Sequence, residues 1–254
     1  MGDIPDSHPR RDSLLLRQKL VHAAAKGMLA DSALIAHGRG EAFDYLLGEK
    51  TCEGARLAIS ETACRLLSSE KCVISANGNT VALAGPQLIA CAAVLDCPIE
   101  VNIYYRTPKR MKILISTLKE QQQQAMMLYP EIEQDIYRVN ILGGNPDGRI
   151  PNLDGPRAIC HSDGILAADT ILVPLEDGDR CEALIAMGKT VCVIDLNPLS
   201  RTAQTATVTI VDELTRCIPL LFEFLKKPSM GVPLDWNNEE NLQNVIQEML
   251  INFN

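Results

Sequence analysis

The sequence has no pair of cysteines in the C-x-x-C spacing, although nine cysteines are spread over its 254 residues. The usual ligand spacing of a structural zinc site is therefore missing. Several of the cysteines, such as Cys72, Cys91 and Cys192, stand in apolar runs, where a thiol packs as a small hydrophobic group. An odd number of cysteines in a chain of intracellular character favours reduced thiols over disulfides.

Long apolar runs and an excess of positive charge are also missing. No stretch approaches the roughly 18 apolar residues of a membrane-spanning helix, and the first residues lack the apolar segment of a secretory signal. The formal net charge is −8 and the isoelectric point is near 5.1, which argues against nucleic acid or an anionic membrane as the main partner. Aromatic residues make up 4% of the chain, so the expected core is aliphatic. We expect a cytoplasmic protein.

The sequence lacks several motifs that would identify an enzyme class. Met187-Gly188-Lys189-Thr190 imitates the end of a P-loop, but Ala183 stands where the first glycine belongs, and the segment precedes an apolar run instead of following one. Gly38-Arg39-Gly40 lacks the third glycine of a dinucleotide-binding loop, because Phe43 occupies that position. No G-x-S-x-G or H-E-x-x-H occurs, which leaves serine hydrolases and zinc proteases without support. No metal-ligand set is assigned from the side chains.

Short apolar runs that each lead into a polar loop and then a helical segment are what the sequence does contain. They begin near residues 72, 99, 139, 171 and 191, and a further run spans 206–211. This alternation predicts an open, mainly parallel sheet flanked by helices, which is an α/β fold. We expect one domain over residues 1–254, with a loose segment at 1–12, helical additions at both ends, and a C-terminal extension at 226–254.

The stretch Thr170–Thr202 holds two of these units in succession. In parallel sheets, ligands bind at the carboxyl ends of the strands, and both polar loops of this stretch fall there. Each loop carries an acid and an arginine, so we interpret them as two walls of one site for a phosphate-bearing anion. A solvated acidic turn is the alternative for the first loop. The candidate residues are Asp177, Gly178, Asp179 and Arg180 in the first loop, and Asp195, Leu196, Asn197, Ser200 and Arg201 in the second.

Arg39 lies between two glycines in His37-Gly38-Arg39-Gly40-Glu41, a segment that we expect to lead into a short helix. Glycines on both sides would let the backbone approach a ligand while the guanidinium grips a phosphate or carboxylate. A surface arginine in a flexible turn is the alternative. His37 is a candidate base or an oriented binding group, and a satisfied structural histidine fits the sequence equally well.

Three further strand ends carry polar residues. Asn77-Gly78-Asn79 ends one apolar run and opens a helix, a geometry in which exposed N–H groups hold an anion, although a plain turn with a helix cap fits as well. Arg106 and Arg149 follow the next two runs. We take Asn77, Asn79, Arg106 and Arg149 as candidate substrate-binding residues.

Several strings of the sequence resemble one known family. They are HPR…LLLRQKLV, LIAHGRGEAFDYLLGEKT, ISANGN, NPDGRIP, VPLEDGDR and IDLNPLSRTAQTATVTIVD, spread over residues 8–225. In these strings the chain resembles the archaeal phosphopantothenate synthetases, also called 4-phosphopantoate–β-alanine ligases, of coenzyme A biosynthesis. The resemblance implies a homodimeric Rossmann-like fold that binds ATP.

The implied reaction converts ATP, 4-phosphopantoate and β-alanine into AMP, pyrophosphate and 4′-phosphopantothenate. The resemblance further implies nucleotide contacts from Arg17, from Arg39 and from the two polar loops of the stretch Thr170–Thr202. Two polyanions must meet in that reaction, which demands positive groups and Mg²⁺. We therefore expect Arg17, Arg39 and Arg180 to hold the ATP phosphates, with His37 near the α-phosphate.

Two other functions stay open from the residues alone. A nucleotide-dependent phosphotransferase could use the same loops and would leave ADP. A nucleotide-sensing protein would bind ATP without consuming it. The residues alone indicate only an α/β protein for a phosphate-bearing ligand.

Overall fold

The apolar runs form the strands of one sheet in a computed structural model that describes residues 4–227 and 235–252. Within these residues, six parallel strands are ordered β3-β2-β1-β6-β7-β8. The central strands β1 (Cys72–Ala76), β6 (Thr170–Pro174) and β7 (Thr190–Ile194) are almost wholly buried. The outer strands are shorter and span Ile99–Val101 (β2), Ile141–Leu142 (β3) and Val208–Ile210 (β8). The open parallel sheet expected from the sequence is confirmed.

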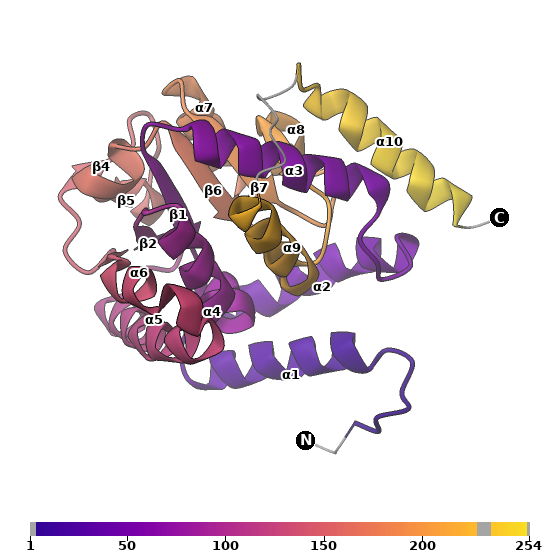
Figure 1. Ribbon diagram of the computed structural model, residues 1–254, viewed down its shortest axis with the longest axis horizontal. Helices are drawn as coiled ribbons and strands as arrows, with labels where there is room; N and C mark the ends of the chain where they lie inside the picture. Colours follow the sequence, from indigo (N-terminus) through magenta and orange to yellow (C-terminus); the bar gives the residue numbers. More distant parts are fainter. Residues whose placement is uncertain (1–3, 228–234, 253–254) are drawn as a thin grey trace.

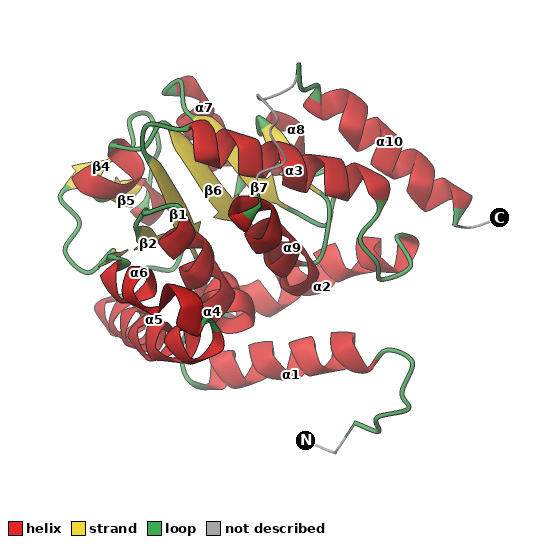
Figure 2. Ribbon diagram, in the orientation of Figure 1, coloured by secondary structure: helices red, strands yellow, loops and turns green. Residues whose placement is uncertain are grey.

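Side chains alternate between the two faces of this sheet, and each face packs against its own set of helices. Leu172 of β6 faces the larger core, against helices α3 (Glu53–Ser68), α4 (Gly78–Val94) and α9 (Leu214–Lys226). Ile171 and Val173 face the smaller core, together with residues of α7 (Gly178–Ala186) and of the segment 150–168. Figures 1 and 2 show the sheet between these two layers. A sheet buried on both faces explains why its strands are apolar throughout.

The helices α5 (Pro108–Leu128), α6 (Glu133–Arg138) and α10 (Asn238–Ile251) pack beside the layer formed by α3, α4 and α9, whereas α8 (Arg201–Thr205) packs against α7. Pro86 lies inside α4, where the sequence predicts a break, and Ala84 leaves the helical conformation with φ −139°, so the helix is kinked there. The helices α5 and α6 pack beside α4. The short α8 follows β7. Near the end of the chain, α10 packs on α3, and Glu248 accepts hydrogen bonds from the first backbone amides of α3.

An irregular insertion takes the place of a crossover helix between β3 and β6. It contains an antiparallel hairpin of β4 (Gly148–Arg149) and β5 (Ile159–Cys160), the 3₁₀ turn η2 (Pro156–Ala158) and the π-helical segment η3 (Ser162–Leu166). Asn102, directly after β2, donates hydrogen bonds to the carbonyls of Arg157 and Ile159. The buried carboxylate of Glu100 accepts from the backbone amides of His161 and Ile165. These bonds fix the insertion across the smaller face.

Helices α1 (Arg11–Ala25) and α2 (Asp31–Leu46) precede α3 in the chain. The sequence predicts a short helix only after His37–Glu41, with a flexible turn as the alternative at Arg39, and α2 instead runs through the whole segment. Glycine lowers helix propensity but does not forbid a helix when neighbouring residues favour it. Within the segment 1–12, expected to be loose, Arg10 forms ion pairs with Glu41 and Glu49.

The helical conformation at Gly38 can be tested by stability. A Cβ built at Gly38 meets no atom within 4 Å. Replacing Gly38 with alanine is therefore expected to raise the free energy of unfolding by about 0.5–1 kcal/mol, the usual advantage of alanine over glycine inside a helix. Urea denaturation followed by circular dichroism measures it. Gly48, which has φ +70°, is the matched control, and alanine should destabilise the protein there. A loss of stability on Gly38→Ala would contradict the helical assignment.

No helix in the described part of the chain is both long enough and apolar enough to span a membrane.

Candidate functional site

The strand order reverses direction between β1 and β6, and a crevice at such a reversal is the usual ligand position in an open α/β sheet. Asn77 follows β1 and bridges the two strand ends, since its side-chain amide donates to the carbonyls of Pro174 (3.2 Å) and Leu175 (2.8 Å). Leu175 has φ +58°, in the left-handed region. Such a conformation costs free energy in a non-glycine residue and is concentrated at functional sites. The corner between β1 and β6 is therefore held in a specific shape.

Asn77 and Asn79 make structural hydrogen bonds at the start of α4. The side-chain oxygen of Asn77 accepts from the backbone amide of Thr80 (3.1 Å), so Asn77 is the N-cap of α4. The buried amide of Asn79 donates to the carbonyl of Ala33 in α2 (3.2 Å). A Cβ at Gly78 would lie 2.7 Å from the carbonyl oxygen of Met28, so only glycine fits this contact. The Asn77–Asn79 turn thus joins the sheet to the N-terminal helices.

The loop after β6 contains a buried cluster of charges. Glu176 has a fully buried side chain that pairs with Arg180 on one side and with Arg157 on the other. Arg157 also pairs with Asp177, and Arg180 donates to the hydroxyl of Ser75 in β1 (3.2 Å). Burial alone would raise the pKa of Glu176, but the two guanidinium charges outweigh it and leave that pKa lowered. The carboxylate is therefore ionised near neutral pH.

This cluster changes the interpretation of Arg180. The sequence predicts that Arg180 touches ATP phosphates, yet the residue is 0% exposed. Its guanidinium is buried, with the carboxylate of Glu176 and the hydroxyl of Ser75 as its partners. Its Nε and Nη2 have no hydrogen-bond partner within the described residues. Arg180 therefore orders the loop from beneath, while Asp177 and Asp179 remain exposed above it.

The loop after β7 lies directly against the loop after β6, as the sequence predicts. A Cβ at Gly178 would stand 3.0 Å from the Cβ of Arg201, which pairs with Asp179 and Glu182. The hydroxyl of Thr202 donates to the carbonyl of Glu176 (2.9 Å). The two loops thus form adjoining walls at the carboxyl edge of the sheet.

Asp195 organises the loop after β7. Its carboxylate accepts from the backbone amide of Asn197 (2.9 Å) and from the hydroxyl of Ser200 (2.5 Å). Ser200 in turn caps α8 through the backbone amide of Ala203. Burial raises the pKa of Asp195, and the two hydrogen bonds oppose that rise. The side chain of Asn197 accepts from the amide of Leu199, so the Asp195 and Asn197 side chains both hold the loop itself.

Helix α2 brings Arg39 to the same region. A Cβ at Gly40 would lie 3.5 Å from the Cβ of Leu196, which places α2 directly against the loop after β7. Arg39 is exposed. His37, one residue before Gly38, is partly buried, and burial lowers its pKa, with the charge of Arg17 adding to the effect and that of Glu41 opposing it. His37 is therefore mainly neutral at pH 7.

Ion pairs attach α2 to its neighbours. Arg17 of α1 pairs with Glu41 at 3.0 Å. One turn further along α2, Asp44 is held by Arg216 of α9, which also pairs with Asp212. These contacts engage the guanidinium of Arg17, and its side chain remains 44% exposed. Arg157 and Arg216 lie outside the strings that carry the family resemblance, and Asp44 and Glu176 lie inside them without a predicted role. Nothing in the local pattern shows which distant charge each of these residues meets.

The two remaining candidates lie beyond β2 and β3. Arg106 donates to the carbonyl of Gly143 (2.6 Å) and so ties together the ends of β2 and β3. Burial lowers the pKa of Arg106, with Glu100 opposing the shift. Arg149 is exposed on β4 and donates to the carbonyl of Leu153. No hydrogen bond or ion pair in the described part of the chain joins either arginine to the two loops after β6 and β7.

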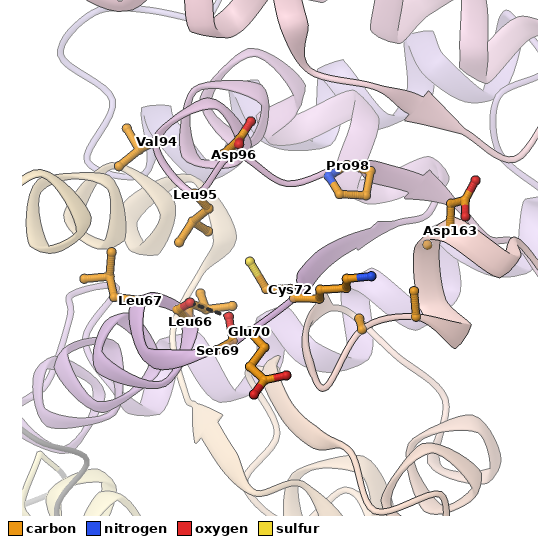
Figure 3. Close-up of a pocket in the computed structure, with 14 residues that line it drawn as sticks. Leu66, Leu67, Ser69, Glu70, Cys72, Val94, Leu95, Asp96, Pro98 and Asp163 are labelled. Atoms are coloured by element: carbon orange, nitrogen blue, oxygen red, sulfur yellow. Dashed lines mark hydrogen bonds between the residues drawn. The ribbon is translucent and has the colours of Figure 1, made fainter.

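A surface cavity of about 470 Å³ lies at the opposite, amino edge of the sheet. Figure 3 shows its lining, which includes Cys72, Leu95, Pro98 and Asp163. None of the residues predicted for ligand binding lies there. The carboxyl edge is the stronger candidate site, because the exposed Arg201, the exposed carboxylates and the start of α7 lie there, and α2, which carries the exposed Arg39, packs against it.

Comparison with known proteins gives a consistent result. The chain matches the family described as phosphopantothenate/pantothenate synthetase over residues 54–251, a range that includes α10. It is 44% identical over 243 residues to a 4-phosphopantoate–β-alanine ligase of Thermococcus kodakarensis, covering 96% of this chain and 86% of the relative. Proteins with the same name from Thermococcus onnurineus (46% identity; 89% and 82% covered) and Methanosarcina mazei (41% identity; 98% and 95% covered) are also similar.

Proposed function

Because this chain belongs to the phosphopantothenate/pantothenate synthetase family, we propose that it is a 4-phosphopantoate–β-alanine ligase acting in coenzyme A biosynthesis. The observation that carries the proposal is the identity of 41–46% to archaeal ligases of that name over most of both chains. The enzyme uses ATP to join the carboxyl group of 4-phosphopantoate to the amino group of β-alanine. The two adjoining loops at the carboxyl edge support this assignment, because they offer charged groups to an anionic ligand.

We further propose that the reaction proceeds through an acyl-adenylate. A carboxylate oxygen of 4-phosphopantoate attacks the α-phosphorus of ATP. The bond between this phosphorus and the oxygen that bridges to the β-phosphate breaks, which releases pyrophosphate. The amine of β-alanine then attacks the acyl carbon, loses a proton, and displaces AMP as the new amide forms. Neither step can begin unless two polyanions are held close together, so orientation and charge neutralisation supply much of the rate.

The side chains divide into groups that meet the ligand and groups that hold the loops. Arg39 and Arg201 are exposed at the rim and suited to phosphate oxygens, and Arg17 reaches the same region from α1. Arg157 and Arg180 act through Glu176 and keep the start of α7 in place. His37 is a neutral imidazole and remains our candidate near the α-phosphate.

Mg²⁺ and a homodimer are part of the same proposal. Within the described residues no group of three or more His, Cys, Asp or Glu side chains could hold a metal ion. Mg²⁺ usually binds through one or two carboxylates together with substrate phosphates, and Asp177 and Asp179 are exposed enough to serve. When bound, the ion would neutralise phosphate charge. The homodimer rests on the family resemblance, and the use of ATP supports a cytoplasmic location.

The decisive experiment identifies the products. Purified protein given ATP, 4-phosphopantoate and β-alanine is expected to form AMP, pyrophosphate and 4′-phosphopantothenate in equal amounts, measured by liquid chromatography and mass spectrometry. With ¹⁸O in the pantoate carboxylate, one labelled oxygen should appear in AMP, because that oxygen attacks the α-phosphorus. Formation of ADP, with the ¹⁸O label found in inorganic phosphate, would indicate a phosphotransfer mechanism instead. ATP binding without consumption would indicate a nucleotide-sensing protein and contradict the ligase assignment.

A further inference from the structure

Two cysteines that are distant in the sequence meet at the amino edge of the sheet. The register of the parallel strands β1 and β2 places Ile74 opposite Ile99. Counting back two residues from each isoleucine puts Cys72 opposite Cys97, on the same face as the two isoleucines. All four residues belong to the larger core. Neighbouring strands lie about 4.8 Å apart, which is within the Cα separation of roughly 4.4–6.8 Å that a disulfide requires.

The two thiols are in direct contact and lie at the border of a cavity. They share a hydrogen bond, and the Cys72 sulfur is also hydrogen-bonded to Ser69. Cys72 is 8% exposed and Cys97 is 6% exposed, whereas Cys91 and Cys192 are fully buried. Figure 3 shows the Cys72 sulfur pointing into the amino-edge cavity, between Leu95 and Pro98. A small molecule in that cavity therefore reaches the sulfur.

We propose that Cys72 and Cys97 form an oxidation site at which a peroxide converts the two thiols into a disulfide. The Cys72 sulfur attacks one oxygen of the peroxide, the O–O bond breaks, the other oxygen leaves with the thiol proton as water, and Cys72 becomes a sulfenic acid. The Cys97 sulfur then attacks the Cys72 sulfur, the S–O bond breaks, and water leaves. In sum, two thiols and one hydrogen peroxide give one disulfide and two waters, so the peroxide is reduced by the two electrons that the thiols lose.

The cavity assigns the first step to Cys72, because the Cys72 sulfur borders it. The hydrogen bond between the two thiols acts in the same direction. It lowers the pKa of the Cys72 thiol, although burial opposes this, and the same bond together with burial raises the pKa of Cys97. The thiolate is the reactive form, so Cys72 attacks first and Cys97 resolves the sulfenic acid. The resulting bond links the starts of β1 and β2, and stabilises the chain by closing the loop between them.

Mass spectrometry tests the link directly. Cys72, Cys91 and Cys97 share one tryptic fragment, from Cys72 to Arg106, so a protease that cleaves before Asp96 must be added. After treatment of the whole protein with hydrogen peroxide, fragments 72–95 and 96–106 are expected to be joined by a bond that dithiothreitol breaks. The thermal unfolding midpoint of the oxidised protein should rise by several degrees and return on reduction.

Single variants decide which sulfur is involved. Cys91→Ser should keep both the joined fragments and the shift of the midpoint, because only Cys72 remains in fragment 72–95. Cys72→Ser and Cys97→Ser should lose both, with folding checked by circular dichroism. Joined fragments in Cys72→Ser would assign the bond to Cys91 and overturn the proposal. Peroxide-treated wild type without joined fragments would overturn it as well. The readouts do not depend on ligase activity.

Discussion

Replacing Arg39 with alanine is expected to lower ligase turnover by at least about 100-fold, the usual cost of removing one group that stabilises charge in a transition state. Arg39 is exposed on α2, beside the contact between Gly40 and Leu196. No hydrogen bond or ion pair of its side chain occurs within the described residues, and alanine favours a helix. The fold should therefore be unchanged. Pyrophosphate release measures turnover, and thermal unfolding by circular dichroism measures stability.

Two companion variants make the result specific. Arg138→Ala removes an exposed arginine near the amino edge of the sheet and should leave turnover unchanged. Arg39→Lys keeps the charge but loses the planar fork that binds two oxygens at once, so we expect an intermediate turnover. If Arg39→Ala stays within a few-fold of the wild-type rate, Arg39 does not hold the phosphates. The family assignment would survive that outcome, because it rests on sequence identity.

The parallel sheet was predictable because its strands are encoded locally. β1, β6 and β7 are continuous apolar runs followed by polar loops, and such runs are typical of strands buried on both faces. The same pattern predicts that the loops after β6 and β7 adjoin, since carboxyl ends of neighbouring parallel strands share one edge. The contact between Gly178 and Arg201 confirms that neighbourhood. The proposed ligand contacts of these loops remain predictions.

Partners that depend on tertiary structure could not be predicted. Arg180 follows an exposed acidic turn in the sequence and resembles a ligand-binding arginine, but the fold buries it against Glu176. Arg157, in a Gly/Pro-rich link, gives no local sign of its contact with the same carboxylate. The first part of α2 was missed, and only a short helix after Glu41 was expected, because glycines at 38 and 40 indicate a turn when the helices packed around them are unknown. The Cys72–Cys97 contact likewise depends on the register of β1 and β2.

The buried cluster around Glu176 leads to the largest expected effect on stability. Glu176→Gln is nearly isosteric, but it removes the negative charge that lies between Arg157 and Arg180. Arg180 would then keep the hydroxyl of Ser75 and the more distant charge of Glu100. Breaking a buried pair by removing one partner costs about 3–5 kcal/mol. We expect a loss of that size in the free energy of unfolding, together with slower turnover because the start of α7 is no longer held.

The pH dependence separates the lost charge from a packing defect. The folded-state pKa of Glu176 is lowered, so its stabilising contribution is complete above the unfolded pKa of roughly 4.3. It is lost as the pH falls through the lower folded value, because both states then carry the protonated acid. The difference in the free energy of unfolding between wild type and Glu176→Gln should therefore be constant from about pH 5 to 7. It should become smaller below pH 4. Urea denaturation across this range measures it.

A matched exposed pair supplies the control for Glu176. Glu131 pairs with Lys226 on the surface, where solvent screens both charges, so Glu131→Gln should change stability little at any pH. If Glu176→Gln were equally mild, the two arginines would be satisfied without the carboxylate and would not position the loop after β6 through it. If the difference were large but did not become smaller in acid, the loss would arise from packing, because a charge effect must vanish when the wild-type carboxylate is protonated.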